Sequence, residues 1–352
     1  MNRSKRIHNN PLLIKLFVIC SLISSGLSAQ QTKFILEGRV VDKQSGEPIP
    51  LVNVYLAQTT LGSATDTNGN FKIYDVPGAM FSLVASAIGY EPHIVNVDLR
   101  KGINKLIDIR LSPKIYELGE VDIQAKADDD WKKQLELFKK LFFGENDFAK
   151  YCEIKNPYHI NFNEEDFVFT ANASSPIFIR NNAFGYEIEC VLKFFQYDKR
   201  KRTLAFSIFP KFSEIVSADK DSMKLFQNNR KSAFLGSSVH LLSALAAGRF
   251  KYRDEGFELK LESNPVGKAE EIVTRDITSN RYYLNYNGCI LIDYWFGGIR
   301  KLSKLCLVFG STEFSSDGYL MYPGEFEMSG AMAKEGVATL LPRFLETARG
   351  NN

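Results

Sequence analysis

The chain has 352 residues, of which 45% are hydrophobic and 24% charged, so wholesale disorder is excluded and two domains are the natural expectation. Its formal net charge of +3 comes from the N-terminus. Residues 1–29 hold four basic and no acidic residues, and without them 40 Lys and Arg stand against 41 Asp and Glu, a net charge of −1. This balance gives no reason to expect nucleic acid as a partner.

Residues 1–29 have the pattern of a secretory signal peptide. Basic residues come first, the apolar run Leu16–Ile23 follows, and small residues lead to Ala29, after which we expect cleavage. The run is shorter than the ~20 residues of a membrane-spanning helix, and no later segment is long and apolar enough, so no transmembrane segment is expected after cleavage. Lipidation at Cys20 is disfavoured because the bulky Ile19 precedes it.

Four cysteines remain after this cleavage: Cys152, Cys190, Cys289 and Cys306. Export makes disulfides chemically possible. The spacings are wide, however, and neither a C-x-x-C motif nor a Cys/His cluster occurs. We expect buried free thiols, with one disulfide as the alternative, and neither a metal nor a cofactor.

Residues 33–111 contain short β-type runs broken by turn signals, which is typical of a β-sandwich. The stretch "DTNGN", which begins at Asp66, mimics the start of a calcium loop. An EF-hand needs Gly and Glu at its sixth and twelfth positions, where this chain has Phe71 and Pro77, so a metal loop is excluded. Asn68 and Gly69 instead predict a hairpin turn between two strands.

The segment "GRVVD…GEPIPLVNVYL…GSATDTNGNFKIYDVPGAMFSLVASAIGYEP" closely resembles the carboxypeptidase-regulatory-like module. The resemblance implies a seven-stranded, transthyretin-like sandwich with Phe71 and Ile73 in its core. It also implies a spacer or interaction module without catalytic residues. The signature positions are Gly38, Asp42, Pro48, Asn53, Asp66, Gly69, Phe71, Pro77, Gly89 and Tyr90.

Two larger architectures that contain this module do not fit the chain. Metallocarboxypeptidases carry a zinc peptidase domain, but none of His93, His159 and His240 begins an H-x-x-E ligand pair. In gram-negative TonB-dependent receptors the module precedes a plug and a barrel, and residues 117–125 resemble the segment that closes it there. Only 227 residues follow Ala125, too few for a plug and about 22 strands of roughly 10 residues.

Residues 126–352 are expected to form a β-rich α+β domain, which begins after the sandwich (residues 30–125) at "AKADDD". Apolar residues from Trp131 to Phe142 recur at helical spacing, and Gly144 is placed to end that helix. Strand-rich stretches follow over 158–216 and 256–328. Between them, residues 219–247 predict one long helix or two short ones with a weak point at Gly236. The segment 336–345 predicts a short closing helix.

The second domain also resembles, piecewise, uncharacterised exported proteins of the same envelopes. Asn229, Arg230, Gly236, Ser237 and His240 carry that resemblance, and all but Gly236 form our candidate site in this half. The simplest interpretation is that Arg230 and His240 tie a helix to a sheet. A serine hydrolase is disfavoured, because His240 occupies the second Gly position of the G-x-S-x-G elbow.

Taken together, these patterns favour an exported envelope protein without enzymatic activity, in the periplasm, on the outer membrane or at the cell surface. Its expected role is to bind or adapt an envelope or outer-membrane protein, with the sandwich as spacer or interaction module. One alternative is glycan binding by the sandwich, through Tyr55, Tyr74 and Tyr90. A second is hydrolysis in the second domain, where Glu164, Glu165 and Asp166 cluster, although sequence alone does not place two carboxylates opposite each other.

Overall fold

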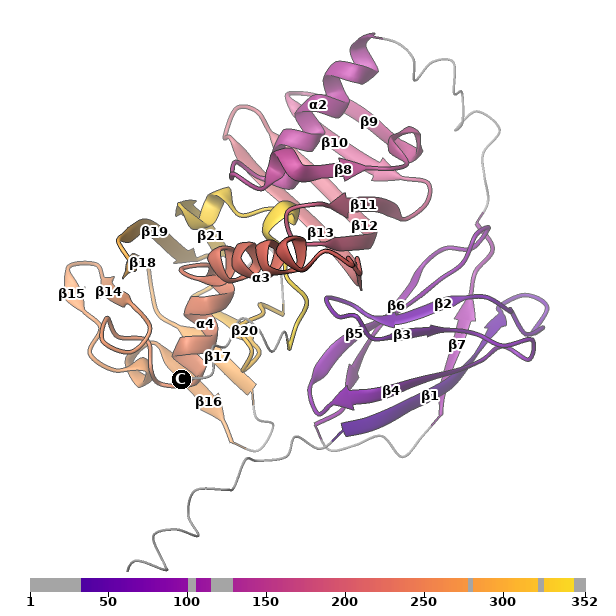
Figure 1. Cartoon of the computed structure of the whole chain (residues 1–352), viewed down its shortest axis with the longest axis horizontal. Coiled ribbons are helices and arrows are strands. Elements are labelled where there is room, and N and C mark those ends of the chain that lie inside the picture. The colour runs from indigo at the N-terminus through magenta and orange to yellow at the C-terminus, as the bar shows by residue number, and fades with distance from the viewer. Residues whose placement is uncertain (1–32, 101–105, 115–128, 278–280, 322–325, 345–352) are drawn as a thin grey trace, which may run out of the picture.

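The computed structural model describes residues 33–100, 106–114, 129–277, 281–321 and 326–344 (Figure 1). The predicted signal peptide, Cys20 and most of the predicted boundary at 125–130 lie outside these ranges. Within them, no helix has the length and apolarity required to cross a membrane.

The first folded unit is a seven-stranded β-sandwich, which confirms the predicted fold class (Figure 1). One sheet has the order β4-β1-β7 and the other β3-β2-β5-β6. Alternating apolar side chains, among them Leu36, Val40 and Phe71, fill the space between the sheets. The strands are β1 (Lys33–Asp42), β2 (Asn53–Leu56), β3 (Gly62–Ala64), β4 (Asn70–Pro77), β5 (Met80–Ser86), β6 (His93–Asp98) and β7 (Ile107–Leu111).

The Asn68-Gly69 turn forms, but the predicted hairpin is wrong. The carboxylate of Asp66 accepts hydrogen bonds from the main-chain N–H groups of Asn68 and Asn70, at 2.9 and 2.8 Å. Gly69 has φ +75°, and its carbonyl accepts a 2.8 Å bond from the N–H of Val40 in β1. That bond directs β4 to pair with β1, so the turn carries the chain from one sheet to the other.

The second domain begins with helix α2 (Asp129–Phe143), which packs on a six-stranded sheet (Figure 1). Gly144, at φ +82°, follows the helix as predicted. Phe138 and Phe142 stack at 4.7 Å and meet Phe195 of the sheet, so aromatic rings dominate this core. The order is β8-β11-β12-β10-β9, with β13 paired to β12. The bounds are β8 (Cys152–Ile154), β9 (Ile160–Glu165), β10 (Val168–Ala173), β11 (Ile177–Asn181), β12 (Tyr186–Asp198) and β13 (Thr203–Glu214).

Two helices follow, α3 (Lys220–Phe234) and α4 (Ser238–Ala246), and Gly236 separates them at φ +72°. They lead to a five-stranded sheet of order β15-β14-β18-β19-β21 and a three-stranded sheet of order β16-β17-β20. These strands are β14 (Phe257–Leu261), β15 (Asn264–Pro265), β16 (Val273–Asp276), β17 (Arg281–Asn285), β18 (Cys289–Phe296), β19 (Ile299–Leu307), β20 (Ser311–Phe314) and β21 (Phe326–Gly330).

The predicted closing helix is wrong over the described residues: only the 3-10 turn Val337–Thr339 forms there. Pro342 disfavours a helical conformation at the residue before it, and Leu340 is already extended. The other 3-10 turns are Ala149–Tyr151, Pro157–His159, Ala269–Glu271 and Met332–Lys334.

The cysteines differ from the main expectation. Cys289 and Cys306 form a disulfide across the directly paired strands β18 and β19, while Cys190 is a buried free thiol and Cys152 a half-buried one. The two bonded cysteines are 17 residues apart in the sequence. They lie opposite each other because of the register in which β18 and β19 pair, and the sequence alone does not reveal that register. Burial raises the pKa of the Cys152 thiol to about 12, which leaves it protonated.

The sandwich is docked on the second domain through the outer face of β2 and β5. Tyr55 is fully buried there, clusters with Val84 and Val191, and donates a 2.9 Å hydrogen bond from its hydroxyl to the carbonyl of Phe209 in β13. Main-chain hydrogen bonds run from Gln58 to Pro210 at 2.6 Å and from Phe212 to Thr59 at 2.9 Å. Apolar burial and backbone pairing together fix the module in place.

Candidate functional site

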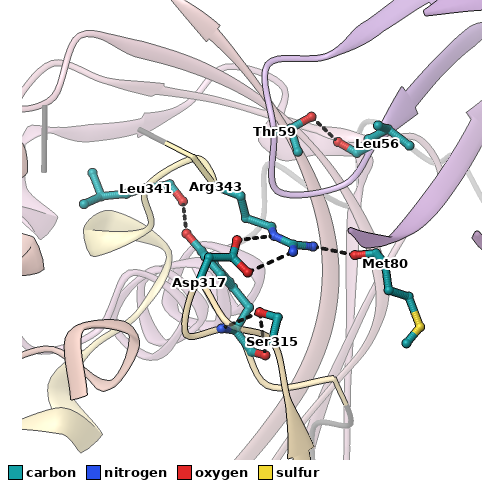
Figure 2. A network of polar contacts seen from close by, with 8 residues as sticks. Leu56, Thr59, Met80, Ser315, Asp317, Leu341 and Arg343 are labelled. Atoms are coloured by element: carbon teal, nitrogen blue, oxygen red, sulfur yellow. Dashed lines mark hydrogen bonds and ion pairs between the residues drawn. The ribbon is translucent and has the colours of Figure 1, made fainter. Parts of the chain in front are cut away.

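The C-terminal segment closes the junction between sandwich and second domain through Arg343 (Figure 2). Its guanidinium donates two hydrogen bonds to the carboxylate of Asp317, at 2.7 and 3.0 Å, and a third to the carbonyl of Met80 in β5, at 2.8 Å. The main-chain N–H of Arg343 donates to the carbonyl of Gln58 at 2.7 Å. One residue therefore joins the last described segment to two strand ends of the sandwich.

This ion pair is deeply buried, with side-chain exposures of 3% for Arg343 and 6% for Asp317. Burial alone would raise the pKa of Asp317, but the charge and hydrogen bonds of Arg343 outweigh it and hold the pKa below its usual value. The rings of Phe81, Tyr319 and Phe344 surround the guanidinium, with centroids at 4.7, 5.5 and 5.1 Å. The pair is thus fully compensated, as a buried charge requires.

A cavity of 230 Å³ lies beside this junction. Gln58 contributes from the sandwich and β13 contributes apolar side chains. The remaining lining residues come from the ends of α3 and α4, the loop after β20 and the C-terminal segment. A second cavity of 380 Å³ shares Gln58, Phe206 and Ile208 with it. Ligand sites occur preferentially at such domain junctions. Besides Gln58, Phe206 and Ile208, the first cavity is lined by Ala233, Phe234, Ser238, Glu335, Leu340 and Leu341, among others.

The polar centre of the first cavity is the pair Ser238–Glu335. Both groups of Ser238 donate to the carboxylate of Glu335, the main-chain N–H at 3.0 Å and the hydroxyl at 2.6 Å. Burial raises the pKa of Glu335 to about 7, and the Ser238 bonds and the positive charge of Lys301 only partly oppose this. The carboxyl therefore stands near half-protonation at neutral pH.

Two residues predicted as site residues, Asn229 and Arg230, anchor α3. Asn229 donates to the carbonyl of Ala183 at 2.8 Å. Arg230 donates to the carbonyl of Phe184 at 2.8 Å and to the carboxylate of Glu214 at 3.1 Å. Neither side chain is among the residues that line the cavity.

The other two predicted site residues, Ser237 and His240, lie at the N-terminus of α4. The hydroxyl of Ser237 caps the helix by accepting from the main-chain N–H of His240, at 3.1 Å. The imidazole Nδ1 of His240 accepts from the N–H of Gly236 at 3.0 Å, which places the ring proton on Nε2, 3.2 Å from the carboxylate of Glu255. Burial lowers the pKa of His240, although the bond to Glu255 raises it in part.

The signature residues of the sandwich shape turns and strands. Asp42 accepts two main-chain bonds and one from the Tyr90 hydroxyl, and a Cβ at Gly38 would lie 2.2 Å from the carbonyl of Ile107. Asn53 differs, because its side chain contacts the second domain. The side-chain amide donates a hydrogen bond to the carboxylate of Glu189 and accepts one from the ammonium of Lys211. The remaining signature positions Pro48, Phe71, Pro77 and Gly89 lie at strands and turns of the sandwich.

Of the four predicted site residues, Ser237 lines the first cavity, but sequence reasoning missed the polar pair at its centre. Ser238 and Glu335, like the junction residues Asp317 and Arg343, come from separate segments of the chain. Arg343 carried one weak signal, a single charge inside the apolar stretch "LLPRFL". The stretch resembles the end of a helix, so the sequence offers no reason to expect Arg343 at the junction.

Two solved structures show a distant similarity to this chain. A candidate carbohydrate-binding protein from Bacteroides uniformis ATCC 8492 is 10% identical, with coverage of 81% of this chain and 99% of its own and a TM-score of 0.19. A candidate membrane-associated protein of unknown function from Bacteroides fragilis NCTC 9343 is 11% identical, with coverages of 85% and 97% and a TM-score of 0.18. TM-scores this low carry no argument about fold or function.

The sandwich has clearer relatives. The TonB-dependent receptor P39 of Formosa agariphila is 38% identical over 90 residues, which amount to 24% of this chain and 8% of the receptor. The similarity thus reaches one module of a much longer protein. Residues 36–123 match the family model of the CarboxypepD_reg-like domain, so this chain carries a domain of that family, docked on a second, β-rich domain.

Proposed function

We propose that the chain is an exported component of the cell envelope that binds a partner or ligand and catalyses no reaction. The observation that carries this proposal is the docked sandwich, which contributes Gln58 to a cavity that the second domain otherwise lines. A module fixed in this way serves as part of a binding site. The N-terminal signal pattern and the Cys289–Cys306 disulfide support export, because disulfides persist in oxidising compartments.

The geometry of Ser237 and His240 supports a role without catalysis. The hydroxyl of Ser237 bonds the main chain of His240 and not its imidazole, and both ring nitrogens of His240 have partners. A nucleophile needs a base within hydrogen-bond reach of its own proton, and the Ser237–His240 pair lacks that arrangement. The hydroxyl of Ser238 does donate to the carboxylate of Glu335, so this geometry disfavours catalysis by Ser237 and His240 alone. Among the residues that the structure describes, no cluster of three or more His, Cys, Asp or Glu could hold a metal ion.

Glycan binding by the sandwich is the second candidate, and one residue favours it. Tyr74 on β4 is 57% exposed, with the ammonium of Lys72 5.5 Å from its ring centroid. Of the other proposed aromatic contacts, Tyr55 is buried in the junction and Tyr90 is bonded to Asp42. An exposed ring beside a cation suits a flat sugar face with acidic or hydroxyl substituents, so Tyr74 is the position to test.

The experiment is crosslinking in living cells followed by affinity capture of the full chain. Three forms are compared: wild type, Gln58→Ala at the cavity wall, and Tyr74→Ala on the far sheet. We expect an envelope partner or ligand with wild type and Tyr74→Ala, and a weaker yield with Gln58→Ala. If Tyr74→Ala alone loses the captured partner or ligand, the binding site lies on the exposed sheet of the sandwich and not at the cavity. Recovery of the chain from the cytoplasm without any envelope component refutes the proposal.

A further inference from the structure

The 230 Å³ cavity has the properties of a selective small-molecule site. A dry cavity of about 150 Å³ in another protein accommodates benzene. The volume here therefore suits one aromatic ring, or a short alkyl chain, with a small substituent. Most lining side chains are apolar, including Phe206, Ile208, Leu340 and Leu341, so the bulk of an occupant must be apolar as well.

The orientation of the polar groups specifies the substituent. Ser238 directs both of its donors to Glu335, so the hydroxyl and the N–H are already used. Glu335 keeps a part of its surface exposed, and it lines the cavity. A carboxylate oxygen with one donor has capacity for another. The cavity thus presents an acceptor, and a matching ligand has to bring a donor.

The sandwich contributes a second polar group to the cavity. Gln58 uses its main-chain N–H and carbonyl in the junction, with Pro210 and Arg343 as partners, and its half-exposed side chain lines the cavity. The amide can donate and accept, so it tolerates either type of group. The other polar side chains that line the cavity have partners within the protein: the hydroxyls of Tyr319 and Thr339 donate to the main-chain carbonyls of Leu341 and Gly336, and Asp317 bonds Arg343. Selectivity therefore rests on Glu335.

We propose that this cavity binds a small, largely apolar molecule that carries one amine or hydroxyl group, which donates a hydrogen bond to the carboxyl of Glu335. This inference rests on the proposed binding function and names the ligand class of that site. We expect an amine to bind more tightly than an alcohol, because a charge-assisted hydrogen bond to a carboxylate is stronger than a neutral hydrogen bond. The pKa of Glu335, about 7, means that an ammonium group would also draw the carboxyl into its ionised form.

The test uses the full mature chain and three probes of one shape: benzylamine, benzyl alcohol and toluene. Binding is measured by calorimetry and by the rise in melting temperature. We expect benzylamine to bind best and toluene worst. Glu335→Gln should weaken benzylamine binding by about ten- to a hundredfold, the usual effect of losing a bond to a charged group, and should leave toluene unchanged.

Two filling variants and one control complete the design. Ala233→Leu and Ile208→Phe occupy the cavity from different walls, and at least one that retains a wild-type circular dichroism spectrum should abolish binding of all probes. Glu255→Gln removes a carboxyl that bonds His240 outside the cavity and should leave affinities unchanged. Absence of binding by all three probes, or equal affinities in wild type and a folded filling variant, overturns the inference. If the crosslinking experiment still captures a partner, the proposed function survives this failure.

Discussion

Replacing Glu335 by Gln should stabilise the protein at pH 8, and by much less at pH 5. The carboxyl is partly buried beside the N-terminus of α4, with Ser238 as its only hydrogen-bond partner among the described residues. Burial raises its pKa from 4.5 to about 7. The folded state therefore binds the proton more tightly than the unfolded state, and stability falls as pH rises from about 4.5 through 7.

The magnitude follows from the shift. A pKa change of about 2.5 units corresponds to roughly 3 kcal/mol between the low-pH and high-pH limits. The helix dipole of α4 favours a negative charge at this position by about 0.3–1 kcal/mol, so roughly 3 kcal/mol is an upper value. Gln has the shape of the protonated Glu and remains neutral, so the variant should lack this loss of stability.

The assay is urea unfolding of wild type and variant at several values between pH 5 and 8. The difference in free energy of unfolding should grow from about 1 kcal/mol at pH 5 to about 3 kcal/mol at pH 8, in favour of Glu335→Gln. Glu270→Gln, on an exposed 3-10 turn, serves as the control and should give a constant difference across the range. A Glu335→Gln variant that is less stable than wild type by the same amount at every pH would refute the reasoning, because Glu335 would then act as an ionised helix cap.

Four further predictions follow from single features. Gly69→Val places a β-branched residue at φ +75° with its Cβ 2.4 Å from the carbonyl of Val40, and should cost at least about 1–3 kcal/mol in urea unfolding; an unchanged midpoint contradicts it. Arg343→Met leaves the buried carboxylate of Asp317 unpaired and should cost about 3–5 kcal/mol, with partial recovery on adding Asp317→Asn. Replacing both Cys289 and Cys306 by Ser should cost about 3 kcal/mol, and a chain that is equally stable after reduction argues against the bond. Mass spectrometry of the exported chain should find Gln30 at its N-terminus, whereas an acylated Cys20 contradicts the cleavage site.

Local patterns in the sequence predicted the sandwich and the helix of residues 129–143, because both depend on residues that are near one another in the chain. The turn at Gly69 has the expected residues, yet which sheet its strands join depends on a bond from Val40, and sequence periodicity does not contain that information. The disulfide required the register of β18 and β19 in the same way.

The cavity could not be predicted, because it depends on tertiary packing. Ser238 and Glu335 lie far apart in the sequence and meet only when the second domain folds, and Gln58 joins them when the β2–β5 face is buried on β13. Conversely, the four predicted site residues are conspicuous in sequence because each has a specific hydrogen-bonding task. Asn229 and Arg230 anchor α3, and Ser237 caps α4. The two ring nitrogens of His240 are hydrogen-bonded to Gly236 and Glu255.

The hydrogen bond between Arg343 and the carbonyl of Met80 joins residues separated by 263 positions. A chain that is synthesised from its N-terminus completes β5 long before Arg343, so the Tyr55 face stays uncovered until β13 arrives, and the bond to Met80 forms last. Long-range closure of this kind slows folding, and exposed apolar surface favours aggregation in the interval. The maturation of this protein should therefore depend on how quickly the remainder of the chain arrives, and on chaperones that shield the waiting face.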